Sequence, residues 1–515
     1  MPAWSTPASP AGGVSSARQV NVRLHKNRAT VRQAVQRSIP RSLRSPGWDA
    51  SAASTADRVL NTADCIAACA PVRARQHFAV DSATAARLIA LDKQHLWHPF
   101  TQMQEWCAPD QEPLLITRAD GVWLWDQHGR KYLDGNSSIW TNIHGHGHPT
   151  ITGAIARQLQ LLDHASFLGQ TNEPAIRLAE KLCSFFPGKL ERVFFSDDGS
   201  TAVECALKMA LQYWQMSGHP ERCEFLAFHD AYHGDTLGAA ALGGIPLFHG
   251  RFQHLGFRVH HAAGVEALNA IDEALTARLA GVVVEPLIQG AAGMRTWPEG
   301  MLRTLRQWCD WHGLLLIFDE VMTGFGRTGT MFACQQEGVT PDFLALAKGL
   351  TGGTLPLAAT LTTTQVFSAF LGRPEERKTF FHGHSYCGNP LACAAALGSL
   401  EVFAEDRTLE TLPEKIALLT GALASLQAAH PRHVSAIRQC GMIAGIDVVT
   451  DAESGVPFPW QEQTGARICR AAQAHGLLTR PIRDTLVLMP PLAANAEHLS
   501  LAVEALSAAL REVLG

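Results

Sequence analysis

The sequence predicts an α/β protein: a large domain with a mostly parallel sheet flanked by helices, plus a smaller α+β domain. Short apolar runs at 225–228, 281–284, 314–318 and 343–347 carry no charge, and stretches with helical spacing separate them. This alternation is typical of βαβ units, whose strands are covered by helices on both faces. After about residue 400, amphipathic helices mix with short strands such as LVLMPP (486–491), which predicts the smaller domain.

Composition and pattern divide the 515 residues into four segments. Up to Ala50 the chain has seven Arg and one Lys against a single acid, Asp49. This composition resembles an organellar targeting peptide, with a disordered extension or translated upstream sequence as alternatives. The predicted segments are that extension at 1–80, an N-terminal segment that contributes to the small domain and the functional site at 81–150, the large domain at 151–400 and the small α+β domain at 401–515.

Two local patterns place the first elements of the folded part. GVWLWDQHGRKYLDG (121–135) predicts a hairpin that turns at the polar QHG. Further on, the apolar strand VFFS (193–196) meets DDGST, and TAVECALKMALQYWQ (201–215) then has apolar residues at helical spacing. A strand therefore passes directly into a helix near residue 199.

Several classes of function are excluded by composition. The net charge of −4 gives no electrostatic reason to bind nucleic acid. No apolar stretch reaches the roughly 18–20 residues that a membrane helix needs. Twelve cysteines without a C-x-x-C pair fit a reducing compartment, so we expect a cytoplasmic protein, or an organellar one if 1–80 is a transit peptide. HGHGHP (144–149) lacks the framing of a zinc site, and no metal is expected.

Functional groups are expected at the carboxyl edge of the sheet, where ligands of open α/β sheets bind. Glu285, Asp319 and Lys348 each follow an apolar run at that edge. An acid there can simply cap a helix, and a lysine can simply be solvated. Together, however, Asp319 and Lys348 fit pyridoxal phosphate. This cofactor needs a lysine amine for its Schiff base and an acid that keeps its ring nitrogen protonated.

Three further positions suit the same cofactor and an anionic substrate. Backbone N–H groups of Gly199 and Ser200 would lie at a helix N-terminus, where a phosphate binds well, although an ordinary helix cap would look the same. Tyr232 could stack on a flat ring or belong to the core. Arg480 could hold a substrate carboxylate with its forked guanidinium, or be a surface residue.

GFGRTG (324–329) matches the G-x-G-x-x-G pattern of dinucleotide-binding proteins. That fingerprint should begin where its strand ends and should open a helix, whereas DEVMT intervenes here. The glycines are therefore expected to serve a turn. A nicotinamide-dependent oxidoreductase remains the alternative from another class of enzyme.

The motifs FDEVMTGFGRTG, LALAKGLTGG and HGHSYCGNPLACAAAL (382–397) resemble the class III, fold-type I pyridoxal phosphate aminotransferases, from about residue 88 to the C-terminus. Four narrower motifs resemble the branch of this family that converts 8-amino-7-oxononanoate into 7,8-diaminononanoate in biotin synthesis. They are LWHPFTQM (96–103), DGNSSIWTNIHGHGHP (134–149), LIQGAAGMRTW (287–297) and TRPIRDTLVLMPP (479–491). The resemblance implies S-adenosylmethionine as the amino donor, with lysine as the alternative.

The resemblance also implies roles for matching positions. Lys348 would hold the cofactor and move the substrate proton, and Asp319 would pair with the ring nitrogen. Gly199 and Ser200 would bind the phosphate, Tyr232 would stack on the ring, and His384 and Ser385 would reach the phosphate of the partner subunit in a homodimer with shared active sites. The implied substrate-binding residues are Phe100, Trp140, Tyr232, Lys348, Gly383 and Arg480.

Three positions depart from the common pattern of this branch. Phe100 stands where adenosylmethionine-using members usually have Tyr, Ile139 precedes Trp140 where two Trp are common, and His384-Ser385 replaces a Pro-Thr pair. The first two changes fall at the substrate pocket and bear on the choice of amino donor.

Two alternative functions are compatible with the same fold. One is an ω-amino acid aminotransferase of the same class, and the other is a binding protein without catalytic activity.

Overall fold

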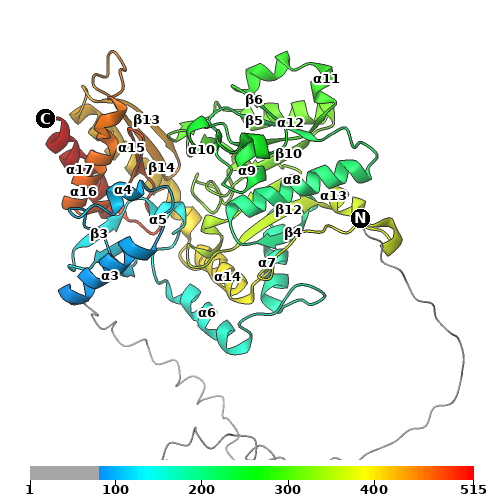
Figure 1. Ribbon diagram of the computed structural model, residues 1–515, viewed down its shortest axis with the longest axis horizontal. Coiled ribbons are helices and arrows are strands. Elements are labelled where there is room, and N and C mark those ends of the chain that lie inside the picture. Colours follow the sequence, from blue (N-terminus) through cyan, green and yellow to red (C-terminus); the bar gives the residue numbers. More distant parts are fainter. Residues whose placement is uncertain (1–79) are drawn as a thin grey trace, which may run out of the picture. The chain divides into compact units, whose positions relative to one another are not determined.

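The computed structural model describes residues 80–515, so the prediction for the N-terminal extension lies almost entirely outside the described residues. The described residues belong to one compact unit, and the predicted boundaries near residues 150 and 400 stay predictions. Figure 1 shows a central sheet with helices packed on it, and smaller sheets, one of which is formed by N-terminal strands together with a C-terminal strand.

The central sheet has seven strands in the order β4-β12-β11-β10-β7-β5-β6. The strands are β4 (Leu190–Ser196), β5 (Glu224–Phe228), β6 (Val259–Ala262), β7 (Leu279–Val284), β10 (Leu315–Asp319), β11 (Phe343–Leu346) and β12 (Ala358–Thr363). Strands β6, β5, β7, β10 and β11 pair in parallel, whereas β12 is antiparallel to both β11 and β4. The predicted, mostly parallel α/β sheet is therefore confirmed.

Strand β7 shows why the apolar runs are continuous. All six of its residues are buried. Val282 and Val284 pack into one core cluster, and Val283 packs into another on the opposite face. Helix α8 (Gly199–Met216) contributes to the second cluster and α12 (Met301–His312) to the first, so each face of the sheet has its own helical layer.

Two four-stranded sheets and one two-stranded sheet, β8 (Ile288–Gln289) with β9 (Arg295–Thr296), complete the sheets of the described residues. The predicted hairpin forms as β2 (Trp123–Asp126) and β3 (Lys131–Asp134), and the C-terminal strand β15 (Leu477–Leu478) adds to it in parallel beside β3. This sheet also includes β1 (Ile116–Asp120). The antiparallel sheet of the C-terminal part has the order β13-β14-β17-β16. Its strands are β13 (Val434–Cys440), β14 (Ile443–Val448), β17 (Thr485–Leu488) and β16 (Pro481–Ile482).

Helices cover these sheets and connect them. Helix α14 (Pro390–Glu405) packs on α6 (Pro149–Leu161) and α7 (Glu173–Cys183). The C-terminal helices are α15 (Thr408–Ala429), α16 (Thr464–Ala474) and α17 (Ala496–Leu514), and shorter helices include α3 (Ser82–His95), α4 (Met103–Trp106), α9 (Leu237–Leu242), α10 (Pro246–His249), α11 (Glu273–Thr276) and α13 (Thr364–Ala369). Within the described residues, none of the helices combines the length and apolar character that crossing a membrane requires.

The glycine-rich segment 324–329 forms buried turns rather than the start of a helix. Its Arg327 is fully buried, and burial lowers the pKa of the guanidinium to about 9. Nη1 donates to the carbonyl of Pro490 (2.7 Å) and Nη2 donates to that of Asn142 (2.6 Å). Arg327 therefore ties this segment to two others that are distant in sequence.

Replacing Arg327 by alanine is expected to lower the free energy of unfolding by about 3 kcal/mol, because two charge-assisted hydrogen bonds are lost and two buried carbonyls keep no partner. Urea denaturation measures the change. The control is Arg192→Ala, since Arg192 is exposed and we expect an effect of about 0.5 kcal/mol or less. Equal stabilities of the two variants would contradict the role assigned to Arg327.

Candidate active site

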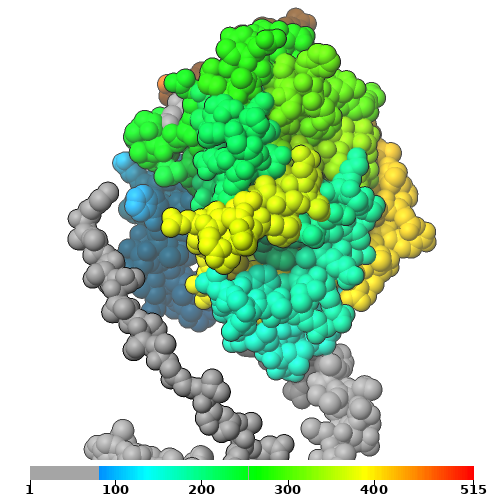
Figure 2. Space-filling model, turned by 90° about the vertical axis from the view of Figure 1, so that its right-hand side faces the viewer, coloured from blue at the N-terminus to red at the C-terminus, as the bar shows by residue number. Residues whose placement is uncertain are grey.

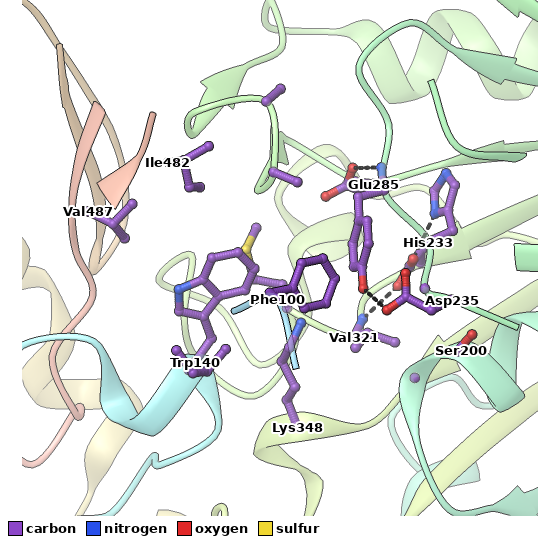
Figure 3. A pocket seen from close by; sticks show the side chains of 18 of the residues that line it. Phe100, Trp140, Ser200, His233, Asp235, Glu285, Val321, Lys348, Ile482 and Val487 are labelled. Carbon is purple, nitrogen blue, oxygen red and sulfur yellow. Dashed lines mark hydrogen bonds and ion pairs between the residues drawn. The ribbon is translucent and has the colours of Figure 1, made fainter. Parts of the chain in front are cut away.

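A cavity of about 1410 Å³ opens at the carboxyl ends of the central strands. Glu285, Asp319 and Lys348 line it from just beyond β7, from the end of β10 and from just beyond β11, so the three strand-end residues come together. Figure 3 shows Lys348 beside Trp140, with His233 and Asp235 farther along the cavity. The predicted residues that line it are Phe100, Trp140, Gly199, Ser200, Tyr232, Asp319, Lys348 and Arg480.

Lys348 combines burial with an unfavourable backbone conformation. Burial lowers the pKa of its amine, the charges of Asp319 and Glu285 oppose that shift, and the nearby Arg327 adds to it. Its φ of 30° lies in the left-handed region, which costs a non-glycine residue of order 1–3 kcal/mol. The amine lies 4.8 Å from the ring centroid of Trp140. The surroundings therefore favour an amine that gives up its proton readily.

Asp319 is held by a histidine that the sequence did not single out. Nδ1 of His233 lies 2.7 Å from Oδ2 of Asp319, and the backbone N–H of Val321 donates to Oδ1 (3.1 Å). Burial disfavours a charge on His233, but the hydrogen bond and charge of Asp319 outweigh it, and the pKa of His233 is raised. His233 follows Tyr232 directly, and its pairing with an acid 86 positions later left no sequence signal.

Glu285 is the second buried acid at this edge. Burial raises the pKa of its carboxyl to about 7. The backbone N–H groups of Tyr232 and Gly290 donate to it at 3.2 and 2.9 Å. Glu285 therefore fixes the positions of two loops that line the cavity.

The N-terminus of α8 faces the cavity through Gly199 and Ser200. Asp198 caps the helix, and its side chain accepts a hydrogen bond from the backbone N–H of Thr201 (2.9 Å). A Cβ at Gly199 would lie 2.5 Å from Cγ1 of Val321, so only glycine lets the helix start this close to the strand end. The first N–H groups of a helix have no intrahelical partner and favour an anion.

Tyr232 lines the cavity but also makes protein contacts of its own. Its hydroxyl donates to Oδ2 of Asp235 (2.7 Å), and its ring stacks on His249 with centroids 5.7 Å apart. Burial and the Asp235 charge raise the pKa of the phenol well above its ordinary value. Phe100, which is 59% exposed, meets the Tyr232 ring edge-on at 6.4 Å.

Trp140 belongs to a left-handed helical turn, α5 (Ser137–Trp140). The φ angles of Ser137, Ser138, Ile139 and Trp140 are 46°, 48°, 66° and 70°. Left-handed helix costs about 1–2 kcal/mol per residue for L-amino acids other than glycine, so this turn costs roughly 4–8 kcal/mol in isolation. The surrounding structure must supply compensating contacts. The indole N–H of Trp140, for example, donates to Oδ1 of Asn136 (2.8 Å).

The cavity lining also includes apolar side chains and arginines. Trp140, Ile482 and Val487 form the apolar part (Figure 3). Arg438 is paired with Asp447 and donates to the carbonyl of Gly293. Arg480 has no carboxylate partner within the described part of the chain, and it is exposed to the cavity. Its guanidinium is therefore available to an anionic ligand.

Gly383, His384 and Ser385 do not line this cavity. All three are exposed on the surface, and Nδ1 of His384 lies 3.6 Å from Oδ2 of Asp197 at the cavity rim. The histidines of HGHGHP have protein partners: His144, His146 and His148 lie beside Ser399, Asp134 and Asp406. Residues 80–515 hold no group of three or more His, Cys, Asp or Glu arranged for a metal ion.

The donor set fits pyridoxal phosphate. A helix N-terminus, a buried carboxylate and a buried amine share one cavity, as an anionic group, a ring nitrogen and an aldehyde require. The sequence reasoning missed His233 and the Arg438–Asp447 pair. The only sequence signal for His233 is its place next to Tyr232 in AYHGDTLGA (231–239).

Comparison with known proteins agrees with this chemistry. The model of the family "Aminotransferase class-III" matches residues 107–510. The adenosylmethionine-8-amino-7-oxononanoate aminotransferase of Geobacter sulfurreducens is 47% identical over 82% of this chain and 97% of its own length. The enzyme of that name from Aquifex aeolicus is 45% identical over 82% of this chain and 96% of its own.

Solved structures give the same result. The adenosylmethionine-8-amino-7-oxononanoate aminotransferase of Methanocaldococcus jannaschii matches with a TM-score of 0.81 and 40% identity, over 83% of this chain and 99% of that one. An amine transaminase from an uncultivated Pseudomonas species, solved in its pyridoxal phosphate-bound form, matches with a TM-score of 0.75 and 33% identity, over 81% of this chain and 98% of that one. This chain therefore belongs to the class III aminotransferases and uses pyridoxal 5′-phosphate.

Proposed function

We propose that this aminotransferase converts 8-amino-7-oxononanoate into 7,8-diaminononanoate in biotin synthesis, with S-adenosylmethionine as amino donor and lysine as the alternative donor. The observation that carries the substrate assignment is that the Lys348 amine and the guanidinium of Arg480, which has no carboxylate partner among the described residues, line the same cavity of about 1410 Å³. A keto acid with a long apolar chain would place its carboxylate at Arg480 and its carbonyl near Lys348. The names of the relatives support the same substrate.

Bound pyridoxal phosphate supplies an electron sink that stabilises negative charge on the substrate carbon. Asp319 would hold a proton on the ring nitrogen, with its carboxylate kept in place by His233. Gly199 and Ser200 would hold the phosphate at the start of α8, and Tyr232 would face the ring from the cavity lining. Lys348 would bind the aldehyde, and its amine, whose pKa burial lowers, is suited to accept and return the substrate proton.

Arg480→Ala is expected to lower kcat/KM for 8-amino-7-oxononanoate about 10- to 100-fold, mostly through KM, because one charge-assisted contact is lost far from the reacting carbon. Steady-state kinetics at saturating donor measure it. The matched control is Arg483→Ala, since Arg483 is also exposed and also lines the cavity. A larger effect at Arg483 would move the carboxylate site to that residue.

The first experiment is a half-reaction between the holoenzyme and 7,8-diaminononanoate. We expect the cofactor's visible absorbance to bleach while 8-amino-7-oxononanoate is released. No bleaching with this diamine, together with bleaching by ornithine or 4-aminobutyrate, would assign the chain to another class III branch. Forward assays with S-adenosylmethionine and with lysine then identify the donor. Phe100, where a tyrosine hydroxyl is common in the branch, makes lysine worth testing at equal concentration.

We also infer a homodimer with shared active sites. Figure 2 shows the segment around residues 370–390, in yellow, exposed beside the cyan-green segment of residues 150–190. These neighbouring segments expose large apolar side chains: Leu161 (81%), Leu168 (85%) and Phe381 (83%). Such a surface is typical of a protein interface. His384 and Ser385 lie in the same segment and would reach the partner's phosphate site.

A cytoplasmic location is proposed on the basis of the thiols. Ten cysteines of the described residues are free. Many free thiols are typical of a reducing compartment. Fractionation of cells with a C-terminally tagged chain would test this location against the organellar alternative.

A further inference from the structure

The left-handed turn α5 places Trp140 beside the Lys348 amine, yet the turn contains no glycine to make that backbone conformation easy. We propose that Asp134, which does not line the cavity, is a positioning residue that fixes this turn and thereby holds Trp140 against Lys348. Nothing in the proposed mechanism above uses Asp134. Its effect on catalysis rests on the proposed function, whereas its effect on Trp140 does not.

Asp134 is buried at the end of β3, with a relative exposure of 2%. Its Oδ1 accepts the backbone N–H of Ser138 (2.9 Å), and its Oδ2 accepts the Ser138 hydroxyl (2.8 Å). Nε2 of His146, beyond the turn, lies 2.9 Å from the same Oδ2. One carboxylate therefore binds the second residue of the turn twice and also binds the segment that follows it.

The other contacts of the turn fix its ends. The hydroxyl of Ser137 donates to the carbonyl of Met489 (2.6 Å), and the backbone N–H of Thr141 donates to the carbonyl of Ser137 (2.9 Å). Between these anchors, the Asp134 carboxylate accepts from both hydrogen-bond donors of Ser138, while the Ser138 carbonyl accepts from the Thr141 hydroxyl (3.1 Å). Without it, φ of Ser138 and Ile139 can return to negative values, which favour residues with a Cβ. That change would turn the Trp140 side chain away from the amine.

The same sheet offers a matched control. Asp126, at the end of β2, is equally buried at 1% exposure and accepts hydrogen bonds from Arg130 and from the hydroxyl of Tyr132 (2.7 Å). It does not line the cavity and does not contact α5. Asp126→Ala should therefore destabilise the fold about as much as Asp134→Ala while leaving Trp140 in place.

The test is a double-mutant cycle with Trp140→Phe, measured on holoenzyme by two readouts. The first is near-ultraviolet circular dichroism: the difference between each protein and its Trp140→Phe derivative isolates the Trp140 signal. We expect this difference spectrum to be lost in Asp134→Ala and retained in Asp126→Ala. Because no substrate is present, this readout is independent of the proposed reaction. An unchanged difference spectrum in Asp134→Ala would overturn the proposal.

The second readout is KM for 8-amino-7-oxononanoate, or for the best acceptor should that ketone fail. Asp134→Ala is expected to raise KM about five- to tenfold, with no further rise when Trp140→Phe is added, because the two residues act through one contact. Additive effects would contradict a shared pathway. Should Asp134→Ala not fold, Asp134→Asn and Ser138→Ala each remove part of the set of hydrogen bonds. A partial loss of the Trp140 difference spectrum and a smaller rise in KM are then expected of both variants, and an unchanged difference spectrum in both would overturn the proposal.

Discussion

Lys348→Ala is expected to lower kcat for transamination by at least about 10³-fold while leaving the fold intact. Proton transfer by a positioned group contributes roughly 10²–10⁴-fold by itself, and this amine also binds the cofactor covalently. Lys348 is the only lysine among the described residues that line the cavity, so no neighbouring amine can take its place. Single-turnover kinetics with 7,8-diaminononanoate would measure the loss.

Two controls separate the reactive amine from its charge. Lys348→Arg keeps a positive charge but offers no neutral amine near pH 7, so it should be as inactive as the alanine variant. Lys189→Ala removes an exposed lysine outside the cavity and should keep wild-type activity. Turnover of Lys348→Ala within tenfold of wild type would show that another group carries the proton.

Asp319→Asn should reduce kcat roughly 10²- to 10³-fold, because a neutral amide cannot stabilise a proton on the ring nitrogen. The shape of the side chain is preserved, and His233 can still make one hydrogen bond to it. Pre-steady-state absorbance measurements would locate the slowed step, which should be proton removal from the substrate rather than substrate binding.

Asp235→Asn is the matched control for charge. Asp235 also lines the cavity, but its carboxylate contacts the hydroxyl of Tyr232 rather than His233. We expect a loss of about fivefold or less, the size of one ordinary hydrogen bond. Comparable losses in the two variants would mean that the cavity needs negative charge in general and not an acid at position 319.

Much of the fold could be predicted because burial on both faces leaves a clear pattern. β7, β10 and β11 are continuous apolar runs, and the residues that end them necessarily meet at one edge of the sheet. That geometry is why Asp319 and Lys348 could be brought together from sequence. The sequence does not single out β12 (AATLTT), and nothing in a short Thr-rich strand specifies that it runs antiparallel to β11 and β4.

The rest of the site depends on contacts between residues that are far apart in the sequence. Such contacts cannot be predicted from a single sequence. The pairing of His233 with Asp319 spans 86 positions. Left-handed φ angles in Ser-Ser-Ile-Trp contradict local preference, and Asp134 and Met489 stabilise them from outside the turn. Arg327 lies in a segment that the sequence predicts to be a turn, but its two carbonyl partners, Pro490 and Asn142, are distant in sequence and leave no signal there.

The two carbonyl partners of Arg327 affect how the active site unfolds locally. Asn142 and Pro490 share one guanidinium, and the backbone N–H of Met489 donates to the carbonyl of Gly135 (2.8 Å). These contacts join the segment from Gly135 to Asn142 with the segment that contains Met489 and Pro490, so the two segments should unfold as one cooperative unit. Native-state hydrogen exchange should show equal opening free energies for the amides of Met489 and Asn142. The site would then unfold in a single step, in which the segments around Asn142 and Met489 open together.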